Sequence, residues 1–178
     1  MSPSRISPSD SDMPVDEQLS IINPCPISLP GSSLLHNLIS GPDCQGDALE
    51  YMDADGQRIR FSYSTLHSQA ANLARYLRTC SGANKSERHI IPILIPQCPS
   101  LYISELAILK SGNAFCPLNL DVPEERLRFI LQDVSAKVVL TTKELREKFA
   151  PFEDIFVVTV DDDSVPEDVR SSFEDGVE

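Results

Sequence analysis

Residues 109–131 read LKSGNAFCPLNLDVPEERLRFIL. Within this stretch an apolar helical segment ends near Gly112, a short apolar strand covers 114–118, and a second helix follows. Glycine is common just beyond a helix because it adopts positive φ at little steric cost, so Gly112 predicts a left-handed helix end. A helix, a short strand and a helix in close succession are typical of an α/β protein.

The second helix of this stretch has its own start signal. Asp121 is expected to be the N-cap, with Glu124 as the reciprocal partner of a capping box. Pro123 is compatible with this start, because the first amides of a helix have no acceptor inside the helix. Apolar residues then recur at helical spacing and predict the buried stripe, at Leu127, Ile130, Leu131 and Val134.

Upstream, the sequence predicts a β-hairpin followed directly by a helix. Residues 48–52 and 58–61 are the expected strands, and 53–56 the turn between them. Ser62 is expected to be the N-cap of a helix that runs to about residue 77. The buried face of that helix is predicted at Leu66, Ala70, Leu73 and Leu77.

The rest of the chain alternates short helices with apolar strands. Strands are predicted at 89–95, 137–141 and 154–160, and helices near 34–41, at 100–110 and at 143–149. Pro92 lies inside the first of these strands and predicts an edge position, a bulge or a boundary there. The fold class is therefore α/β, with a leading β-hairpin and then alternating helices and mostly parallel strands.

Composition divides the chain into three segments. Residues 1–31 are rich in Ser and Pro and are expected to be a disordered leader, 32–160 to be the folded part, and 161–178 to be an acidic tail. The tail holds eight acidic residues and one arginine, and so carries −7 of the net charge of −12. No segment has the Lys/Arg stripe that neutralises phosphates, so nucleic acid is not an expected partner.

Targeting and redox signals point to the cytoplasm. The N-terminus lacks the apolar core of a signal peptide, and no apolar run reaches the ~18 residues that cross a bilayer. The five cysteines are scattered and form no CxxC pair, which fits reduced thiols better than a disulfide framework. We therefore expect a cytoplasmic protein with no membrane partner.

The glycines and histidines do not form a recognisable ligand site. Gly41 and Gly46 have the spacing of a phosphate-binding loop, but Asp47 follows where that loop has its lysine. The three histidines are isolated and lack metal-ligand spacing, at His36, His67 and His89.

The paired carboxylates have simpler explanations than catalysis. Glu124 and Glu125 suit the first turn of a helix, where the dipole favours negative charge, and residues 161–163 belong to the acidic tail. We therefore expect no catalytic, cofactor-binding or metal-binding residue in this chain.

Two stretches resemble the first two motifs of the AMP-forming adenylating superfamily, which includes nonribosomal peptide synthetase adenylation domains, acyl-CoA synthetases and luciferases. Residues 61–77, FSYSTLHSQAANLARYL, are similar to Thr/Ser-Tyr-x-Glu-Leu followed by an Ala-Asn-x-Leu-Ala helix. Thr65 stands where the family usually has Glu, and so removes the side chain that would complete a capping box with Ser62.

Residues 109–131 resemble Leu-Lys-Ala-Gly-x-Ala-Tyr-x-Pro-Leu-Asp followed by Pro-x-x-Arg-Leu-x-x-Ile-Leu. Ser111, Phe115 and Asn119 depart from that pattern. Eleven positions agree with it in order, namely Leu109, Lys110, Gly112, Ala114, Pro117, Leu118, Pro123, Arg126, Leu127, Ile130 and Leu131. The Pro-Leu-Asn/Asp form favours a peptide synthetase over an acyl-CoA ligase.

The resemblance implies an incomplete N-terminal subdomain of an adenylate-forming enzyme. The complete enzyme would activate an amino acid or another carboxylic acid with ATP and Mg²⁺ to an acyl-adenylate, and transfer the acyl group to a phosphopantetheine thiol. Its expected partners are the remainder of the adenylation domain and a carrier-protein domain. The family's phosphate loop and catalytic lysine have no counterpart here, and Lys110 matches a structural motif, so the chain alone is expected to be inactive and to need no cofactor.

Two other functions stay open. The chain could be a fragment of an acyl-CoA synthetase, which carries the same first motifs. It could also be a non-enzymatic interaction module derived from the adenylation fold. In each case a sheet that lacks its later strands would leave an apolar edge exposed.

Overall fold

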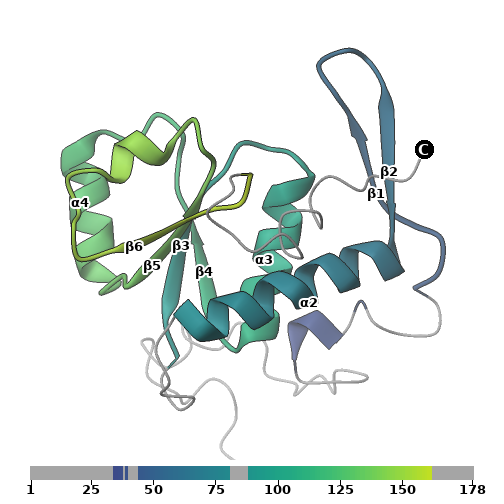
Figure 1. The fold of residues 1–178 in the computed structure, drawn as a ribbon, viewed down its shortest axis with the longest axis horizontal. Coiled ribbons are helices and arrows are strands. Elements are labelled where there is room, and N and C mark those ends of the chain that lie inside the picture. Colours follow the sequence, from purple (N-terminus) through teal and green to yellow (C-terminus); the bar gives the residue numbers. More distant parts are fainter. Residues whose placement is uncertain (1–33, 38, 40–43, 81–87, 162–178) are drawn as a thin grey trace, which may run out of the picture. The chain divides into compact units, whose positions relative to one another are not determined.

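The computed structural model describes residues 34–37, 39, 44–80 and 88–161. The predicted leader, the tail beyond Asp161 and residues 81–87 lie outside the described residues, and the predicted domain limits therefore stay predictions. The described part contains one antiparallel hairpin and one parallel sheet with its helices (Figure 1).

The leading hairpin is confirmed. Strand β1 (Asp47–Met52) pairs antiparallel with β2 (Arg58–Ser62). Asp53 closes the turn, because its Oδ1 accepts the backbone N–H groups of Asp55 at 3.0 Å and Gln57 at 2.7 Å. Gly56 adopts φ 78°, a value that favours glycine.

Helix α2 (Tyr63–Cys80) begins at the residue after the hairpin and runs three residues further than expected. Ser62 is the predicted N-cap, since its Oγ accepts the Thr65 N–H at 3.1 Å. The Thr65 hydroxyl lies 2.9 Å from the Ser62 hydroxyl. This contact between two side chains takes the place of the glutamate carboxylate in a full capping box. All four residues of the predicted stripe are buried, at Leu66, Ala70, Leu73 and Leu77.

The parallel sheet has the strand order β4-β3-β5-β6. In chain order its elements are β3 (Ile90–Leu94), α3 (Pro99–Ser111), β4 (Ala114–Pro117), α4 (Glu124–Asp133), β5 (Val138–Thr141), the 3₁₀ turn η3 (Arg146–Phe149) and β6 (Phe156–Thr159). The left-handed end of α3 is confirmed, because Gly112 adopts φ 91° and donates its N–H to the last helical carbonyls.

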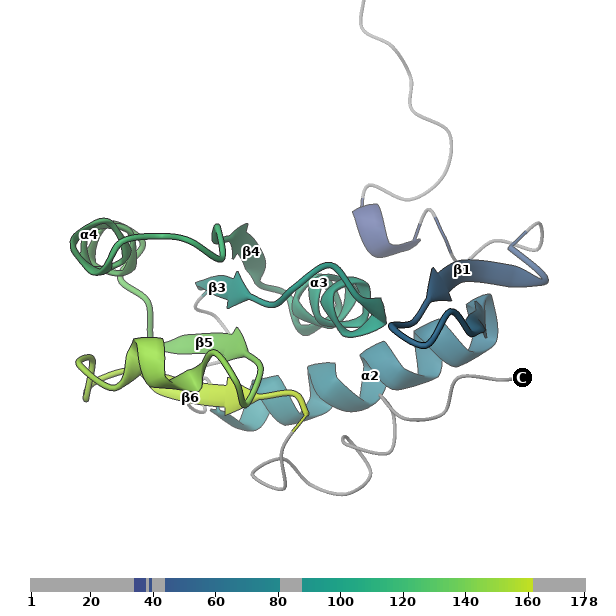
Figure 2. The ribbon, with the colours of Figure 1, turned by 90° about the horizontal axis from the view of Figure 1, so that it is seen from above.

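Helices cover both faces of this sheet. On one face α2 and α3 bury Leu73, Leu77 and Ile108 against alternate residues of β3, β5 and β6. On the other face α4 and η3 bury Leu127, Leu131 and Phe149. Seen along the sheet, α2 and α3 lie to one side of the strands and α4 to the other (Figure 2). Each fully buried leucine contributes roughly 1.5–3 kcal/mol through removal of apolar surface from water.

Pro92 does not lie on an edge strand, contrary to the prediction of an edge position. Strand β3 is inside the sheet, and Pro92 pairs in register with Cys116 of β4. The Leu118 N–H donates to the Ile93 carbonyl at 2.8 Å, so the backbone N–H and carbonyl of Ile93 face β4. Backbone groups of successive residues point to opposite sides of a strand, and the Pro92 nitrogen therefore faces β5. Because proline has no N–H to donate, the β3–β5 ladder begins only at Ile93.

The predicted Asp121 cap is wrong. Helix α4 begins at Glu124, with Pro123 in the N-cap position and no side-chain cap. A residue that precedes proline disfavours the helical backbone conformation, so Val122 prevents the helix from starting before Pro123. Asp121 therefore lies too far from the first turn of α4 to cap it. The Asp121 N–H instead donates to Asn119 Oδ1 at 3.1 Å, and Glu124 pairs with Arg128 at 2.8 Å.

Two predicted helices are single 3₁₀ turns. The one near 34–41 is η2 (Leu35–Asn37), in which Leu34 and Leu35 are exposed, while Leu38 and Gly41 lie outside the described residues. The one at 143–149 is η3, which retains only its last four residues. A segment of three or four residues forms few helical hydrogen bonds, and these do not offset the backbone entropy that is lost when a helix is nucleated.

The Ser62 cap leads to a first prediction. Ser62→Ala removes the acceptor of the Thr65 N–H and is expected to lower the free energy of unfolding by about 0.5–2 kcal/mol. Chemical denaturation measures the change. Ser64→Ala is the matched control, because the Ser64 hydroxyl contacts only the Ser62 side chain. Equal effects of the two substitutions would contradict the assigned cap.

Candidate functional site at the carboxyl edge of the sheet

All four parallel strands end at one edge of the sheet. In open parallel sheets ligands bind outside this carboxyl edge, at the point where the strand order reverses. Here the order reverses between β3 and β5, because β4 follows on one side of β3 and β5 on the other. The segments after these two strands, 95–98 and 142–145, are therefore the best candidates for a binding site.

A buried hydrogen bond ties these two strands together at that edge. The Thr141 side chain is fully buried, and its hydroxyl donates to the Leu94 carbonyl at 2.9 Å. The next residue differs, because Thr142 Oγ1 is buried but has no hydrogen-bond partner among the described residues. Sequence reasoning placed Thr141 at the end of the predicted strand 137–141 and singled out neither threonine, although a Thr-Thr pair directly after the apolar residues VVL was the available signal.

The β3 side of the edge offers little for an anion. Helix α3 begins here, but Pro99 occupies its first turn and supplies no N–H. Cys98 is the N-cap residue, has an extended backbone and makes no side-chain cap bond. The Gln97 side chain is engaged elsewhere, because its Nε2 donates to the Tyr102 hydroxyl at 3.3 Å.

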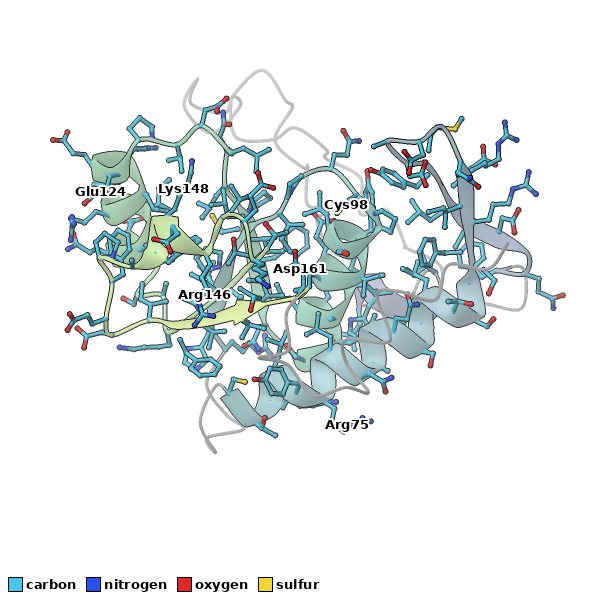
Figure 3. All side chains as sticks on the ribbon, turned by 45° about the horizontal axis from the view of Figure 1, so that its top comes forward. Arg75, Cys98, Glu124, Arg146, Lys148 and Asp161 are labelled. Atoms are coloured by element: carbon cyan, nitrogen blue, oxygen red, sulfur yellow. The ribbon has the colours of Figure 1, made fainter. Side chains whose placement is uncertain are left out.

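The charged groups of the other loops make structural contacts. Lys148 donates through Nζ to the Leu120 carbonyl, and so joins η3 to the loop before α4. Asp161, after β6, accepts the Lys143 N–H at 2.7 Å. The Arg128 guanidinium lies 4.9 Å from the centre of the Phe152 ring. Figure 3 labels Cys98 before α3, Lys148 in η3 and Asp161 after β6.

The residues discussed from sequence do not gather at this edge. Lys110 lies at the last turn of α3, and hence at the opposite edge of the sheet from Cys98, where burial lowers its pKa. His67 Nε2 lies 2.9 Å from the Ile39 carbonyl, at the start of α2. Burial, with the nearby charges of Lys110 and His67, lowers the pKa of His36. His89 lies immediately before β3 at the amino edge.

The described part of the chain contains neither a cluster of metal-ligating side chains nor a disulfide. No group of three or more His, Cys, Asp or Glu side chains there is arranged to hold a metal ion. Cys44, Cys80, Cys98 and Cys116 are free and half-buried, and Cys25 lies outside the described residues. None of the helices in the described ranges has the length and apolar character that crossing a lipid bilayer requires.

The family is decided by comparison with known proteins. Residues 42–177 match the family model described as AMP-binding enzyme. The chain belongs to that family. The resemblance expected from residues 61–77 and 109–131 is thereby confirmed, and the motif positions Gly112 and Leu127 are accounted for as a helix end and a core residue.

The relatives of this AMP-binding enzyme chain are much longer proteins. Nonribosomal peptide synthetase SIDC of Beauveria bassiana is 50% identical over 128 residues, which cover 71% of this chain and 3% of the synthetase. A hydroxamate-type ferrichrome siderophore peptide synthetase of Schizosaccharomyces pombe is 34% identical over 119 residues, covering 64% of this chain and 2% of that protein. The chain therefore spans about 3% of the length of the first relative.

The fold of this family member is also seen in a solved structure. An acyl-CoA synthetase of Brucella canis superposes with a TM-score of 0.62 at 20% identity, over 79% of this chain and 26% of that chain. Similarity at this level of identity shows a shared fold. The predicted α/β class, with a leading hairpin and a mostly parallel sheet, is confirmed.

The described carboxyl edge does not suit a nucleoside triphosphate with magnesium. Such a ligand needs converging backbone N–H groups and lysine or arginine side chains free to reach phosphate. Pro99 removes one N–H from the start of α3, and the Lys148 ammonium is held by the Leu120 carbonyl. Lys143 is an exposed cation in segment 142–145, but the Asp161 carboxylate that accepts its backbone N–H would repel phosphate there. We assign no step of adenylate chemistry to these residues, and the expectation of no site residue stays a prediction.

The buried threonine bond leads to a second prediction. Thr141→Val keeps the side-chain shape but leaves the buried Leu94 carbonyl without its donor, which is expected to cost about 1–3 kcal/mol of unfolding free energy. Thr141→Ser keeps the hydroxyl and serves as the control. Denaturant titration measures both variants, and equal stability of Thr141→Val and the parent would exclude the assigned role.

The pKa of Glu105 leads to a third prediction. Burial on α3 raises the pKa of its carboxyl above the ordinary 4.5, so ionisation is penalised in the folded state. Glu105→Gln is therefore expected to raise stability at pH 7. As the pH falls through 4.5 the carboxyl becomes protonated first in the folded state and then in the unfolded state, so the gain should shrink towards zero. Melting curves at pH 7 and pH 4 measure it, and an equal shift at both values would refute the electrostatic cause.

Proposed function

We propose that this chain is the N-terminal part of an adenylation domain in a nonribosomal peptide synthetase. The complete enzyme activates an amino acid or another carboxylic acid with ATP and Mg²⁺ to an acyl-adenylate, and then transfers the acyl group to a phosphopantetheine thiol. The observation that carries the proposal is 50% identity to a peptide synthetase over 71% of the chain, together with the family match at 42–177.

A peptide synthetase is favoured over an acyl-CoA synthetase. Identity to the Beauveria bassiana synthetase is more than twice the 20% identity to the Brucella canis acyl-CoA synthetase. Asn119 supports this choice, because Pro-Leu-Asn/Asp is the form of the motif that resembles peptide synthetases. Its side chain accepts the Asp121 N–H and so shapes the loop between β4 and α4.

The part that these residues play in the enzyme is that of a scaffold. Adenylate formation builds charge on the transferring phosphoryl group, and its catalysis needs preorganised donors and cations. The described residues instead supply helix ends, a parallel sheet and two buried clusters. The groups that bind ATP belong to the remainder of the domain. The carrier-protein domain is the partner that receives the acyl group, and we place the enzyme in the cytoplasm.

A hydroxamate-type siderophore is our proposed product class. The support is 34% identity to the ferrichrome siderophore peptide synthetase of Schizosaccharomyces pombe over 64% of the chain. Amino acids whose side chains carry a hydroxamate group are therefore the first substrates to test.

The fourth prediction concerns activity. The purified 178-residue chain is expected to show no amino-acid-dependent exchange of pyrophosphate into ATP, because its described carboxyl edge lacks a triphosphate cradle. A hybrid enzyme, in which the matching segment of the Beauveria bassiana synthetase is replaced by residues of this chain, should retain exchange with the amino acid used by the parent. Pyrophosphate exchange with a panel of amino acids measures both proteins.

Two results would count against this proposal. Exchange above background by the purified chain would show a nucleotide site within it. A folded hybrid that binds no ATP would show that these residues do not serve as an adenylation scaffold. The unmodified synthetase domain is the positive control.

A further inference from the structure

The residues that lead into the hairpin are held against two helices. Helix α3 contacts the 3₁₀ turn η2 (Leu35–Asn37), which is purple in Figure 1. Two residues further along, the Ile39 side chain packs against the large apolar cluster that α2 and α3 share. The Ile39 carbonyl lies 2.9 Å from His67 Nε2 of α2. We call residues 35–37 and 39 the entry segment, and these contacts join it to both helices.

Basic side chains gather where the entry segment meets the two helices. His36 comes from η2, His67 from the second turn of α2 and Lys110 from the last turn of α3. They lie close enough for the charges of Lys110 and His67 to act on His36. The Arg78 guanidinium also reaches this end of α3, where it donates to the Lys110 carbonyl at 3.5 Å. Three separate elements therefore bring cationic groups to one junction.

The helices beneath the entry segment offer little negative charge to balance these cations. Helix α2 and the turn η2 contain no acidic residue. The one acidic residue of α3 is Glu105, which projects about 140° around the helix from Lys110. Asp43 lies outside the described residues. Neither helix can therefore neutralise a second cation placed beside Lys110.

The partly buried His36 side chain favours its neutral form. Burial is the largest cause that lowers its pKa below the ordinary 6.5, followed by the charge of Lys110 and then that of His67. A lowered pKa means that the released segment binds the proton more tightly than the docked segment does. The contribution of the docked segment to stability is thus fully present above pH 6.5, and it is lost as the pH falls through the lowered pKa.

The hydrogen bond of His67 is not itself broken by acid. A carbonyl only accepts, so His67 Nε2 must carry the proton that it donates to Ile39. That proton is present in one neutral tautomer and also in the charged imidazole. A charged His67 keeps this bond and adds repulsion towards His36. The proton taken up by His36 therefore decides whether the entry segment stays docked.

We propose that the contact of the entry segment with α2 and α3 is an acid-sensitive switch, with His36 as the group that takes up the proton. At neutral pH the uncharged His36 side chain lies near Lys110, and the segment is docked. In mild acid His36 becomes a cation next to Lys110, and the segment leaves both helices while the hairpin and the sheet stay folded. This inference goes beyond the proposed function and does not rest on it.

Methyl NMR of the 178-residue chain with labelled isoleucines tests the switch. Ile39 reports docking, and Ile59 of β2 is the internal control because it packs against the same apolar cluster. Between pH 7.5 and pH 5.0 the ratio of docked to released Ile39 is expected to fall at least about 3-fold, since the released segment binds the proton more tightly. The Ile59 signal should keep its position.

Three substitutions assign the response to its groups. His36→Asn is uncharged at every pH and is expected to abolish the change at Ile39. Lys110→Met removes the cation but keeps an unbranched side chain, and it should reduce the change at least about 2-fold. His89→Asn is the matched control, because His89 lies at the amino edge of the sheet, directly before β3, and its replacement should leave the full response.

Several results would overturn the proposal. One is an Ile39 signal that does not change with pH, and another is a joint change of Ile39 and Ile59, which would show general acid unfolding. An unchanged response in His36→Asn, a full response in Lys110→Met or a lost response in His89→Asn would contradict the assigned groups. The comparison of Ile39 with Ile59 needs no substitution, and it can be repeated in the hybrid enzyme. Pyrophosphate exchange is not part of this readout, so a failure of the proposed function would be seen separately.

Discussion

The sheet depends on a short ladder between β3 and β5. The two pairs of neighbouring strands, β4 with β3 and β5 with β6, meet only there, and Pro92 limits the ladder to two residue pairs. The Thr141 hydroxyl adds a buried hydrogen bond to the Leu94 carbonyl at the same junction. Because the bond is fully buried, it is worth more to the fold than an exposed contact of the same length. The two apolar clusters pack on the two faces of the sheet that this junction holds together.

That junction also separates what could be predicted from sequence from what could not. The hairpin, the four-residue stripe of α2 and the left-handed Gly112 follow from periodicity and turn chemistry, which act within a few residues. The central position of β3 is set by the partners of that strand, and these lie more than 20 residues away along the chain. Pro92 suggested an edge strand because proline cannot donate a hydrogen bond to a neighbouring strand. The sequence did not show which neighbouring strand its nitrogen would face.

Helix starts show the same division. Ser62 caps α2 as predicted, because the chain enters the helix directly from a strand. Asp121 does not cap α4, because Pro123 restricts Val122 and delays the helix to Glu124. At the carboxyl edge, the Thr-Thr pair after a strand was visible in the sequence, but the bond of Thr141 to Leu94 depends on the pairing of β3 with β5. The family motifs consist of helix ends and core residues. They therefore predicted the helices and strands around this edge, but they did not predict the polar side chains that lie on it.

The direct passage from β2 into α2 has a mechanical consequence. Ser62 is the last residue of the strand and Tyr63 the first of the helix, so no linker residue remains to absorb a change in φ or ψ. The Tyr63 N–H also donates to the Gly46 carbonyl, which fastens the start of the other hairpin strand to the same point. The hairpin and the 18-residue helix are therefore rigidly connected. A force applied at the hairpin turn would reach the core as a tilt of α2 against α3.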